Sequence, residues 1–412
     1  MYDFANSGYT TVVITAVFNA YFVAEVARGA PWATFAWTCA LAASYLAIIA
    51  TAPFIGAYAD AHAAKKKVLA ISTAGCVLFT ASLALVGTGD LWLAIALVAM
   101  SNFFFGTGEN VVAAFLPEIA AEESMGRVSG WGWALGYCGG LVGLGACLAY
   151  VTYAQSKGLP ASHFVAVSML ITAGLFALAS LPTFIFLRER ARPEKRAGIA
   201  RSVAARFADT IRHASRYRDL RRFLVCVVFY QAGIQAVVAL AAIYAQQVMG
   251  FTTRDTITLI LVVNVTAALG AFAFGHVQDR LGHVRTLALT MVAWIAAVLL
   301  AYWAQGPALF WVAANVVGIA LGSSQSAGRA LVGYLSPPSR SAEFFGLWGF
   351  AVKLSAVLGP ITYGFVTWVT NGDHRLAILL TGAYFVVGLA IVARLDVQRG
   401  RSAALAAVSY AP

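Results

Sequence analysis

The sequence predicts an all-α membrane protein with 12 transmembrane helices in two pseudo-symmetric six-helix halves. Three observations lead to this prediction: the composition, the length of the apolar runs, and a motif that occurs once in each half. Of the 412 residues, 61% are hydrophobic and 11% are charged, whereas soluble domains average about 45–50% and about 25%. So few charges cannot cover a water-facing surface, which excludes a soluble enzyme and a disordered chain.

The apolar residues fall into twelve runs separated by charges or turn residues. A helix needs about 20 apolar residues to cross a bilayer, and the runs have this length. We expect helices because lipid leaves no backbone group without an internal partner. The predicted spans are residues 2–26, 34–58, 68–87, 91–117, 130–153, 163–187, 223–247, 255–278, 284–303, 308–334, 343–369 and 376–395.

The positive charges lie mostly on one side of these spans. Of the 28 Lys and Arg residues, 22 fall in one set of loops and only 4 in the other. Cytoplasmic loops carry the excess of positive residues, so we expect both termini in the cytosol and the chain in a bacterial inner (plasma) membrane. The net charge of +11 is then an orientation signal, and no nucleic-acid partner is expected.

Four sections follow from the spans and the charges. We expect an N-terminal six-helix half (1–187), a basic cytosolic linker (188–222), a C-terminal six-helix half (223–397) and a cytosolic tail (398–412). An alternative for the linker is a binding surface for anionic lipid or a partner, formed by short amphipathic helices at the interface.

A short motif follows the second span of each half. The first copy has Gly56 and Asp60, followed by the lysines 65–67, and the second copy begins 219 residues later. That copy reads Gly275-His-Val-Gln-Asp279-Arg280-Leu-Gly282-His-Val-Arg285. Two related halves joined by a linker are typical of duplicated transporters, in which the substrate path runs between the repeats.

The second copy resembles the cytoplasmic loop signature of the major facilitator superfamily, and the first copy differs from it in having Ala61 where Arg is usual. Other stretches resemble the branch of that superfamily that contains the autophagy-related vacuolar amino-acid effluxers and their bacterial relatives. They are residues 2–7 (YDFANS), 115–120 (FLPEIA), 126–129 (GRVS), 136–140 (GYCGG), 325–329 (QSAGR) and 342–346 (AEFFG). The resemblance covers essentially the whole chain and implies the major facilitator fold.

The resemblance also implies a gate. In that superfamily the motif carboxylates tie the halves together on the inner side, so Asp60 should face the start of span eleven and Asp279 the start of span five. A carboxylate at a helix N-terminus is stabilised by about 0.3–1 kcal/mol. The alternative is an ordinary interfacial charge. The implied gating residues are Gly56, Asp60, Gly275, Asp279, Arg280, Arg285 and Glu343.

Four ionisable residues lie within the spans, namely Asp3, Glu109, Arg329 and Lys353. Each costs about 2.5–3.5 kcal/mol at a helix centre, so such residues normally face a cavity or a partner. We expect Glu109 and Arg329 to pair across the cavity, Glu109 to take a proton, and Arg329 to bind a carboxylate. A static pair is the alternative. Lys353 is expected in a cavity or a pair, and Asp3 either takes part in coupling or caps the first helix.

Uncharged polar residues complete the candidate pocket. Tyr230, Gln231 and Gln235 are expected on span seven, and Gln325 lies four residues before Arg329, hence on the same helix face. Asn110 corresponds to Arg329 after the 219-residue shift. Each of these residues can also be a packing contact between helices.

The sequence has no phosphate-binding loop and no His/Cys cluster with metal-ligand spacing. We therefore expect no enzyme activity, no cofactor and no metal. The predicted function is secondary active transport of a small polar or zwitterionic, amino-acid-like metabolite by alternating access, coupled to protons or another ion, by a monomer in the lipid bilayer. A broad-range drug or metabolite exporter is one alternative, and a transporter-shaped receptor or scaffold is another. Substrate identity, import or export, coupling ion, resting conformation and residues before Met1 stay open.

Overall fold

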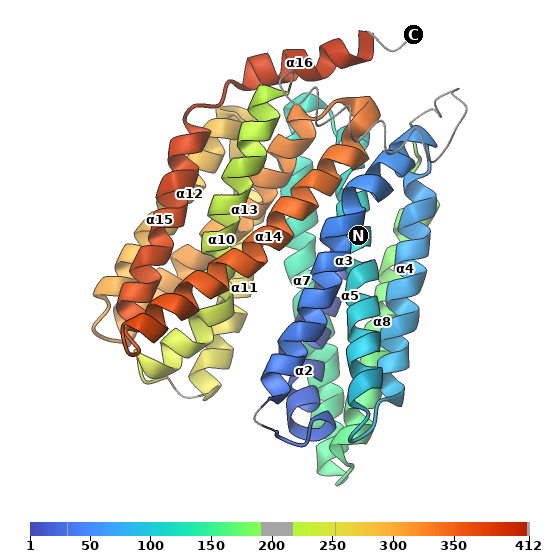
Figure 1. The fold of residues 1–412 in the computed structure, drawn as a ribbon, viewed down its shortest axis with the longest axis vertical. Coiled ribbons are helices and arrows are strands. Elements are labelled where there is room, and N and C mark those ends of the chain that lie inside the picture. The colour runs from blue at the N-terminus through green and yellow to red at the C-terminus, as the bar shows by residue number, and fades with distance from the viewer. Residues whose placement is uncertain (31, 191–216, 252, 410–412) are drawn as a thin grey trace.

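The computed structural model describes residues 1–412 except 31, 191–216, 252 and 410–412 (Figure 1). Its described residues form helices, turns and loops, and twelve helical segments are long and apolar enough to cross a membrane. The all-α prediction with twelve spans in two halves is confirmed.

The first six spans form the N-terminal half (the N-half). Span one is α1 (Tyr2–Tyr9), η1 (Thr10–Ala16), α2 (Phe18–Tyr21) and η2 (Phe22–Val26). The other five are α3 (Ala33–Ala61), α4 (Lys65–Ser82, extended by η3, Leu83–Leu85), α5 (Leu91–Ala113), α7 (Met125–Ser156) and α8 (Ala161–Phe186). The short α6 (Leu116–Ile119) and η4 (Glu122–Ser124) connect α5 to α7.

The last six spans form the C-terminal half (the C-half). They are α10 (Arg218–Gln247), α11 (Thr253–Leu281), α12 (His283–Trp303), α13 (Pro307–Leu335), α14 (Ser341–Val369, preceded by η5, Pro338–Arg340) and α15 (His374–Val392). The tail continues as α16 (Val397–Ser409). Most of the predicted linker lies outside the described residues, and α10 begins five residues before the predicted span.

Helix α4 begins at Lys65, three residues before the predicted span, because its charged first turn has partners. The Glu189 carboxylate accepts hydrogen bonds from the amides of Lys65 (2.7 Å) and Lys66 (3.1 Å). These are first-turn amides, which have no partner inside their own helix. The end of the N-half chain is thereby tied to the start of α4.

Glycines on helix α7 allow two close helix contacts. A Cβ on Gly139 would overlap the carbonyl oxygen of Phe4 on α1, and one on Gly143 would lie 3.1 Å from the Gly8 Cα. On another face, a Cβ on Gly130 would lie 2.9 Å from the Gly275 Cα of α11. Small residues let membrane helices approach at backbone distance, so α7 packs against span one in its own half and against α11 in the other half.

The two ends of the bundle differ in composition. Loops 62–64, 114–124 and 336–340 and helix α16 share one end, which we call the basic side, and the other end is called the opposite side. Figure 1 shows α16 across the basic side. Trp32, Trp92, Trp303 and Trp368 are exposed at opposite-side helix ends. Tryptophan is enriched at membrane–water interfaces, so these side chains mark one membrane boundary.

Candidate functional site

A cavity of about 410 Å³ lies between the halves. Its N-half wall includes a polar stripe on span one, and its C-half wall is mostly aliphatic and aromatic. The cavity extends from Arg329 to Phe310 in the first turn of α13, toward the opposite side. The arrangement suits a ligand with both a polar and an apolar part.

One ion pair in the cavity joins Asp3 of α1 to Arg329 of α13. The Arg329 Nη1 lies 2.9 and 3.0 Å from the two Asp3 oxygens, and its Nε and Nη2 donate to the Oγ (3.1 Å) and the carbonyl oxygen (2.8 Å) of Ser129. The guanidinium carbon lies 5.4 Å from the centre of the Trp133 ring. These contacts place Arg329 in the contact between α13, α7 and α1.

A second ion pair joins Glu109 of α5 to Lys353 of α14 at 3.5 Å. The Lys353 Nζ also lies 5.2 Å from the centre of the Tyr45 ring on α3. The Glu109 side chain is 30% exposed, and it lines the cavity. Like the Asp3–Arg329 pair, this pair crosses from the N-half to the C-half.

The predicted Glu109–Arg329 pair is therefore wrong. Both residues line the same cavity, but the rotation of α13 turns Arg329 toward Asp3 and Ser129. Asp3 binds Arg329, and no capping hydrogen bond from its side chain occurs among the described contacts of α1. The four intramembrane charges form two pairs, each with one member in each half.

Of the predicted polar residues, only Gln235 and Gln325 line the cavity. Gln231 is fully buried, and its Nε2 donates to the Gln325 Oε1 at 2.7 Å. Gln231 therefore contacts a cavity-lining side chain but does not line the cavity itself.

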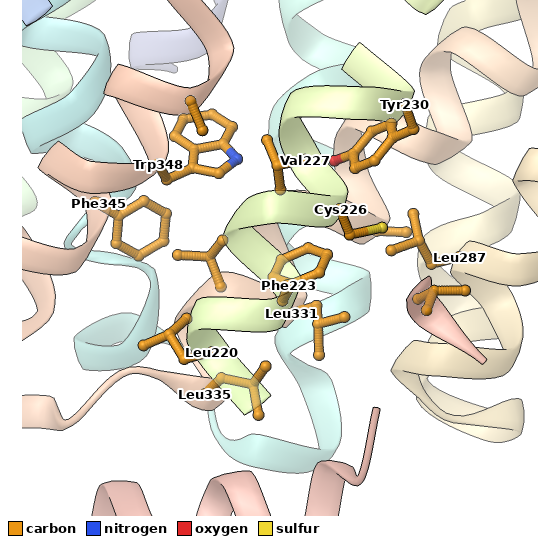
Figure 2. Close-up of a cluster of buried hydrophobic side chains, with 14 of the residues drawn as sticks. Leu220, Phe223, Cys226, Val227, Tyr230, Leu287, Leu331, Leu335, Phe345 and Trp348 are labelled. Carbon is orange, nitrogen blue, oxygen red and sulfur yellow. The ribbon is translucent and has the colours of Figure 1, made fainter. Parts of the chain in front are cut away.

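Two other pocket predictions need correction. Tyr230 is fully buried in an apolar cluster that also contains Cys226, Val227 and Trp348 (Figure 2). Its hydroxyl fills the space beside Gly328, where a Cβ would overlap it. Asn110 is 5% exposed and lies against Gly349 of α14, outside the cavity lining. Both residues are packing contacts between helices.

The sequence reasoning missed the polar stripe on span one. Asn6, Ser7, Thr10, Thr11 and Thr15 all line the cavity. Their spacing of i, i+1, i+4, i+5 and i+9 was a detectable signal, because such residues share one helix face. From Thr10 to Ala16 the segment is a π-helix, a local form that occurs frequently at functional sites.

On the basic side, Asp60 forms the predicted contact with the start of span eleven. The Asp60 Oδ2 accepts a hydrogen bond from the Glu343 amide at 2.9 Å, in the first turn of α14. The buried Glu343 side chain pairs with Arg340 at 3.2 Å. A Cβ on Gly56 would overlap the Ala342 carbonyl, so glycine is required for this approach.

Lys65 supplies the cation for this contact in place of an arginine at Ala61. Its fully buried Nζ lies 3.1 Å from the Asp60 carboxylate and 2.7 Å from the Glu118 carboxylate. It also donates to the Ser341 Oγ of the other half at 2.6 Å. Because Lys65 joins two N-half carboxylates to a C-half hydroxyl, the contact is ionic and inter-half.

Asp279 makes the equivalent contact with the start of span five. Its carboxylate accepts from the amides of Gly126 (2.9 Å) and Arg127 (3.1 Å) in the first turn of α7. A Cβ on Gly275 would lie 2.9 Å from the Gly126 carbonyl oxygen.

The two predicted gating arginines are not part of these contacts. Arg280 and Arg285 are exposed, and neither forms an ion pair with another described residue. The α3–α14 and α7–α11 contacts lie at the basic-side ends of their helices, so the cavity is closed toward that side.

The twelve-helix fold, its paired halves and the cavity between them define a transporter of the major facilitator superfamily. Within it, the chain belongs to the family described as vacuole effluxer Atg22 like, whose model matches residues 33–405. The fold and the family are those of transporters, which are not enzymes.

Relatives of known sequence support this assignment. The chain is 27% identical over 401 residues to YxiO, an uncharacterized MFS-type transporter of Bacillus subtilis (strain 168), covering 95% of this chain and 92% of that protein. It is 26% identical over 205 residues to autophagy-related protein 22 of Candida glabrata, covering 47% of this chain and 38% of that protein.

Two solved structures show the same fold. FucP, a major facilitator transporter in the outward conformation, superposes with a TM-score of 0.74 at 15% identity, covering 96% of this chain and 98% of that one. The human organic anion transporter MFSD10 superposes with a TM-score of 0.71 at 14% identity, covering 95% and 97%.

Proposed function

We propose that this protein is a secondary active transporter of a small, amino-acid-like zwitterion across a bacterial inner membrane, driven by protons. The observation that carries the proposal is the pair of ionic contacts, Asp3–Arg329 and Glu109–Lys353, each of which joins the two halves at the cavity. The rocking units are residues 1–187 and 223–397, with 188–222 as the linker and 398–412 as the tail.

The ion pairs link ligand binding to movement of the halves. Removing one partner from a buried ion pair costs about 3–5 kcal/mol because it leaves a charge uncompensated. A substrate carboxylate replaces Asp3 at Arg329, and a substrate ammonium replaces Lys353 at Glu109. A zwitterion therefore compensates Arg329 and Glu109 when the halves separate, and Asp3 and Lys353 are left to the water of the opened cavity, whereas a neutral solute compensates none of the four charges.

Protonation of Glu109 also breaks one of the pairs. The Glu109 side chain is accessible from the cavity, and its protonation leaves Lys353 without a counter-charge, which favours separation of the halves. We therefore propose Glu109 as the coupling site and Arg329 as the carboxylate site, with Gln235 and Gln325 as further contacts. The contacts of Asp60 and Asp279 are the proposed gate, in which Gly56, Gly275 and Glu343 take part.

The apolar C-half wall favours an amphipathic substrate. Ile234, Val238, Val263, Val317 and Leu321 line it, and such side chains take an apolar group rather than a sugar. The same wall favours the second candidate function, a broad-range exporter of drugs or metabolites. The two functions differ in their need for Arg329, because a lipophilic cation does not bind a guanidinium.

The experiment is a thermal-shift screen of the purified protein against amino acids, dipeptides, sugars and lipophilic cations. We expect stabilisation by amino acids with apolar side chains, and loss of it in Arg329→Gln. A Lys157→Gln variant, which removes an exposed positive charge outside the cavity lining, is the matched control and keeps it. Stabilisation by lipophilic cations in both variants would instead support the broad-range exporter.

A flux measurement separates the transporter from a transporter-shaped receptor or scaffold. Purified protein in proteoliposomes should move the solute found in the screen. In Glu109→Gln, which also loses the ionic contact with the substrate ammonium, the remaining slower flux should not depend on an imposed pH gradient. Binding without flux would support a receptor. Undiminished pH dependence in Glu109→Gln would remove the proposed coupling role of that residue.

A further inference from the structure

The C-terminal helix α16 is anchored to the C-half. Asp219, in the first turn of α10, accepts hydrogen bonds from the Arg399 Nε and Nη2, both at 2.7 Å, and from the Asp396 amide at 3.2 Å. A Cβ on Gly400 would lie 3.2 Å from the Asp219 Cβ and 2.6 Å from the Leu335 side chain, so the helix backbone rests on the ends of α10 and α13.

Helix α16 also carries Arg401, whose side chain reaches from the C-half to the N-half. The Arg401 Nη1 donates to the Tyr334 carbonyl oxygen at 3.0 Å, and its guanidinium carbon lies 5.0 Å from the centre of the Tyr334 ring. The Nε donates to the Glu122 carboxylate at 2.9 Å, and Nη2 binds the same oxygen. Glu122 belongs to η4, directly before α7 of the N-half.

This contact lies beside one of the two gate contacts. Four and five residues after Glu122, the amides of Gly126 and Arg127 bind Asp279 of the C-half. Opening the basic side separates α7 from α11 and from the end of α13. Arg401 cannot then hold both Glu122 and the Tyr334 carbonyl.

We propose that α16 is a strap, a helix that lies across the basic side and holds it closed. The ion pair between Arg401 of α16 and Glu122 of the N-half, which we call the clasp, joins the two halves. The strap lies outside the cavity, so its action does not depend on which solute is carried. Displacing α16, or neutralising the clasp, shifts the protein toward the state that is open on the basic side. The tail thereby sets how much of the protein rests in each conformation.

The clasp is a modest interaction, so its loss should shift the equilibrium between the closed and open states only modestly. The Arg401 side chain is 12% exposed and that of Glu122 is 42% exposed. Ion pairs that water reaches contribute little, and the upper end of their measured range corresponds to about a fivefold change in an equilibrium. We therefore expect about fivefold more of the open state on removal of the clasp.

Hydrogen exchange of residues 121–130 measures this directly, in full-length protein in lipid nanodiscs. Amides in the first turn of a helix have no partner in their own helix, so the protection of Gly126 and Arg127 depends on Asp279 and on closure. In Arg401→Gln and in Glu122→Gln, we expect about fivefold faster exchange there. Lys67→Gln, which removes an exposed charge on the same side, should leave exchange unchanged.

A conservative variant keeps the test decisive if one variant folds poorly. Arg401→Lys keeps a cation that can donate to the Glu122 carboxylate and to the Tyr334 carbonyl oxygen, and its exchange should stay within about twofold of the wild type. The proposal is overturned if Arg401→Gln and Glu122→Gln both exchange at the wild-type rate, or if Arg401→Lys exchanges as fast as Arg401→Gln.

Discussion

Replacement of Lys65 by methionine is the sharpest perturbation of the proposed gate. Methionine keeps most of the side-chain volume but leaves the buried carboxylates of Asp60 and Glu118 without their cation at 3.1 and 2.7 Å. Removing one partner of a buried ion pair costs about 3–5 kcal/mol. Asp60 retains its hydrogen bond from the Glu343 amide, so the inter-half contact is weakened but not abolished.

The same free energy favours opening of the basic side. Separation of α3 from α14 lets water solvate the Asp60 and Glu118 carboxylates. This solvation removes the free-energy cost of the unpaired charges in the closed state. A difference of about 3 kcal/mol corresponds to a shift of roughly a hundredfold in the conformational equilibrium. Lys65→Met should therefore open the basic side far more than loss of the Arg401 clasp does.

Exchange of the Glu343 amide is the assay, because this first-turn amide is protected by Asp60 of the other half. We expect roughly hundredfold faster exchange in Lys65→Met, and partial recovery in Lys65→Met/Asp60→Asn, which removes one of the unpaired charges. Lys66→Met is the matched control, since the Lys66 Nζ binds the Leu187 carbonyl within the N-half. Equal exchange in Lys65→Met and Lys66→Met would show that Lys65 does not hold the basic side closed.

Two glycine substitutions test the contacts between helices. Gly56→Ala places a methyl group on the Ala342 carbonyl and should open the basic side, which faster exchange at the start of α14 would reveal; unchanged exchange would contradict the close contact. Gly132→Ala places a methyl group on the Asp3 carboxylate and on the Arg329 guanidinium, and it should weaken amino-acid binding at least tenfold in a thermal-shift titration. Unchanged affinity there would place the ligand away from this ion pair.

The positions of the spans and the gate contacts were predictable from the sequence. Apolar runs locate membrane helices because lipid imposes both their length and their composition. The repeated motif located Asp60 and Asp279, and the resemblance pointed each to the correct helix start. These predictions needed only the order of the helices along the chain and the ends at which they meet.

The partners inside the membrane were not predictable in the same way. Each residue turns a helix by about a quarter turn or slightly more, so a small error in helix rotation moves Arg329 from Glu109 to Asp3. Lys65 lies in the first turn of α4, and its side chain bends back to Asp60. The loop signature assigns no partner to this lysine, so the contact could not be predicted from it. Both features are set by three-dimensional packing.

Flux of a labelled apolar amino acid into proteoliposomes, with and without an inward proton gradient, is the most direct test of proton-driven amino-acid transport. We expect uptake that the gradient changes severalfold in the wild type, with no gradient effect in Glu109→Gln and no uptake in Arg329→Gln. Equal fluxes in protein-free liposomes and in liposomes containing the wild type, for every amino acid that stabilises the protein, would contradict it.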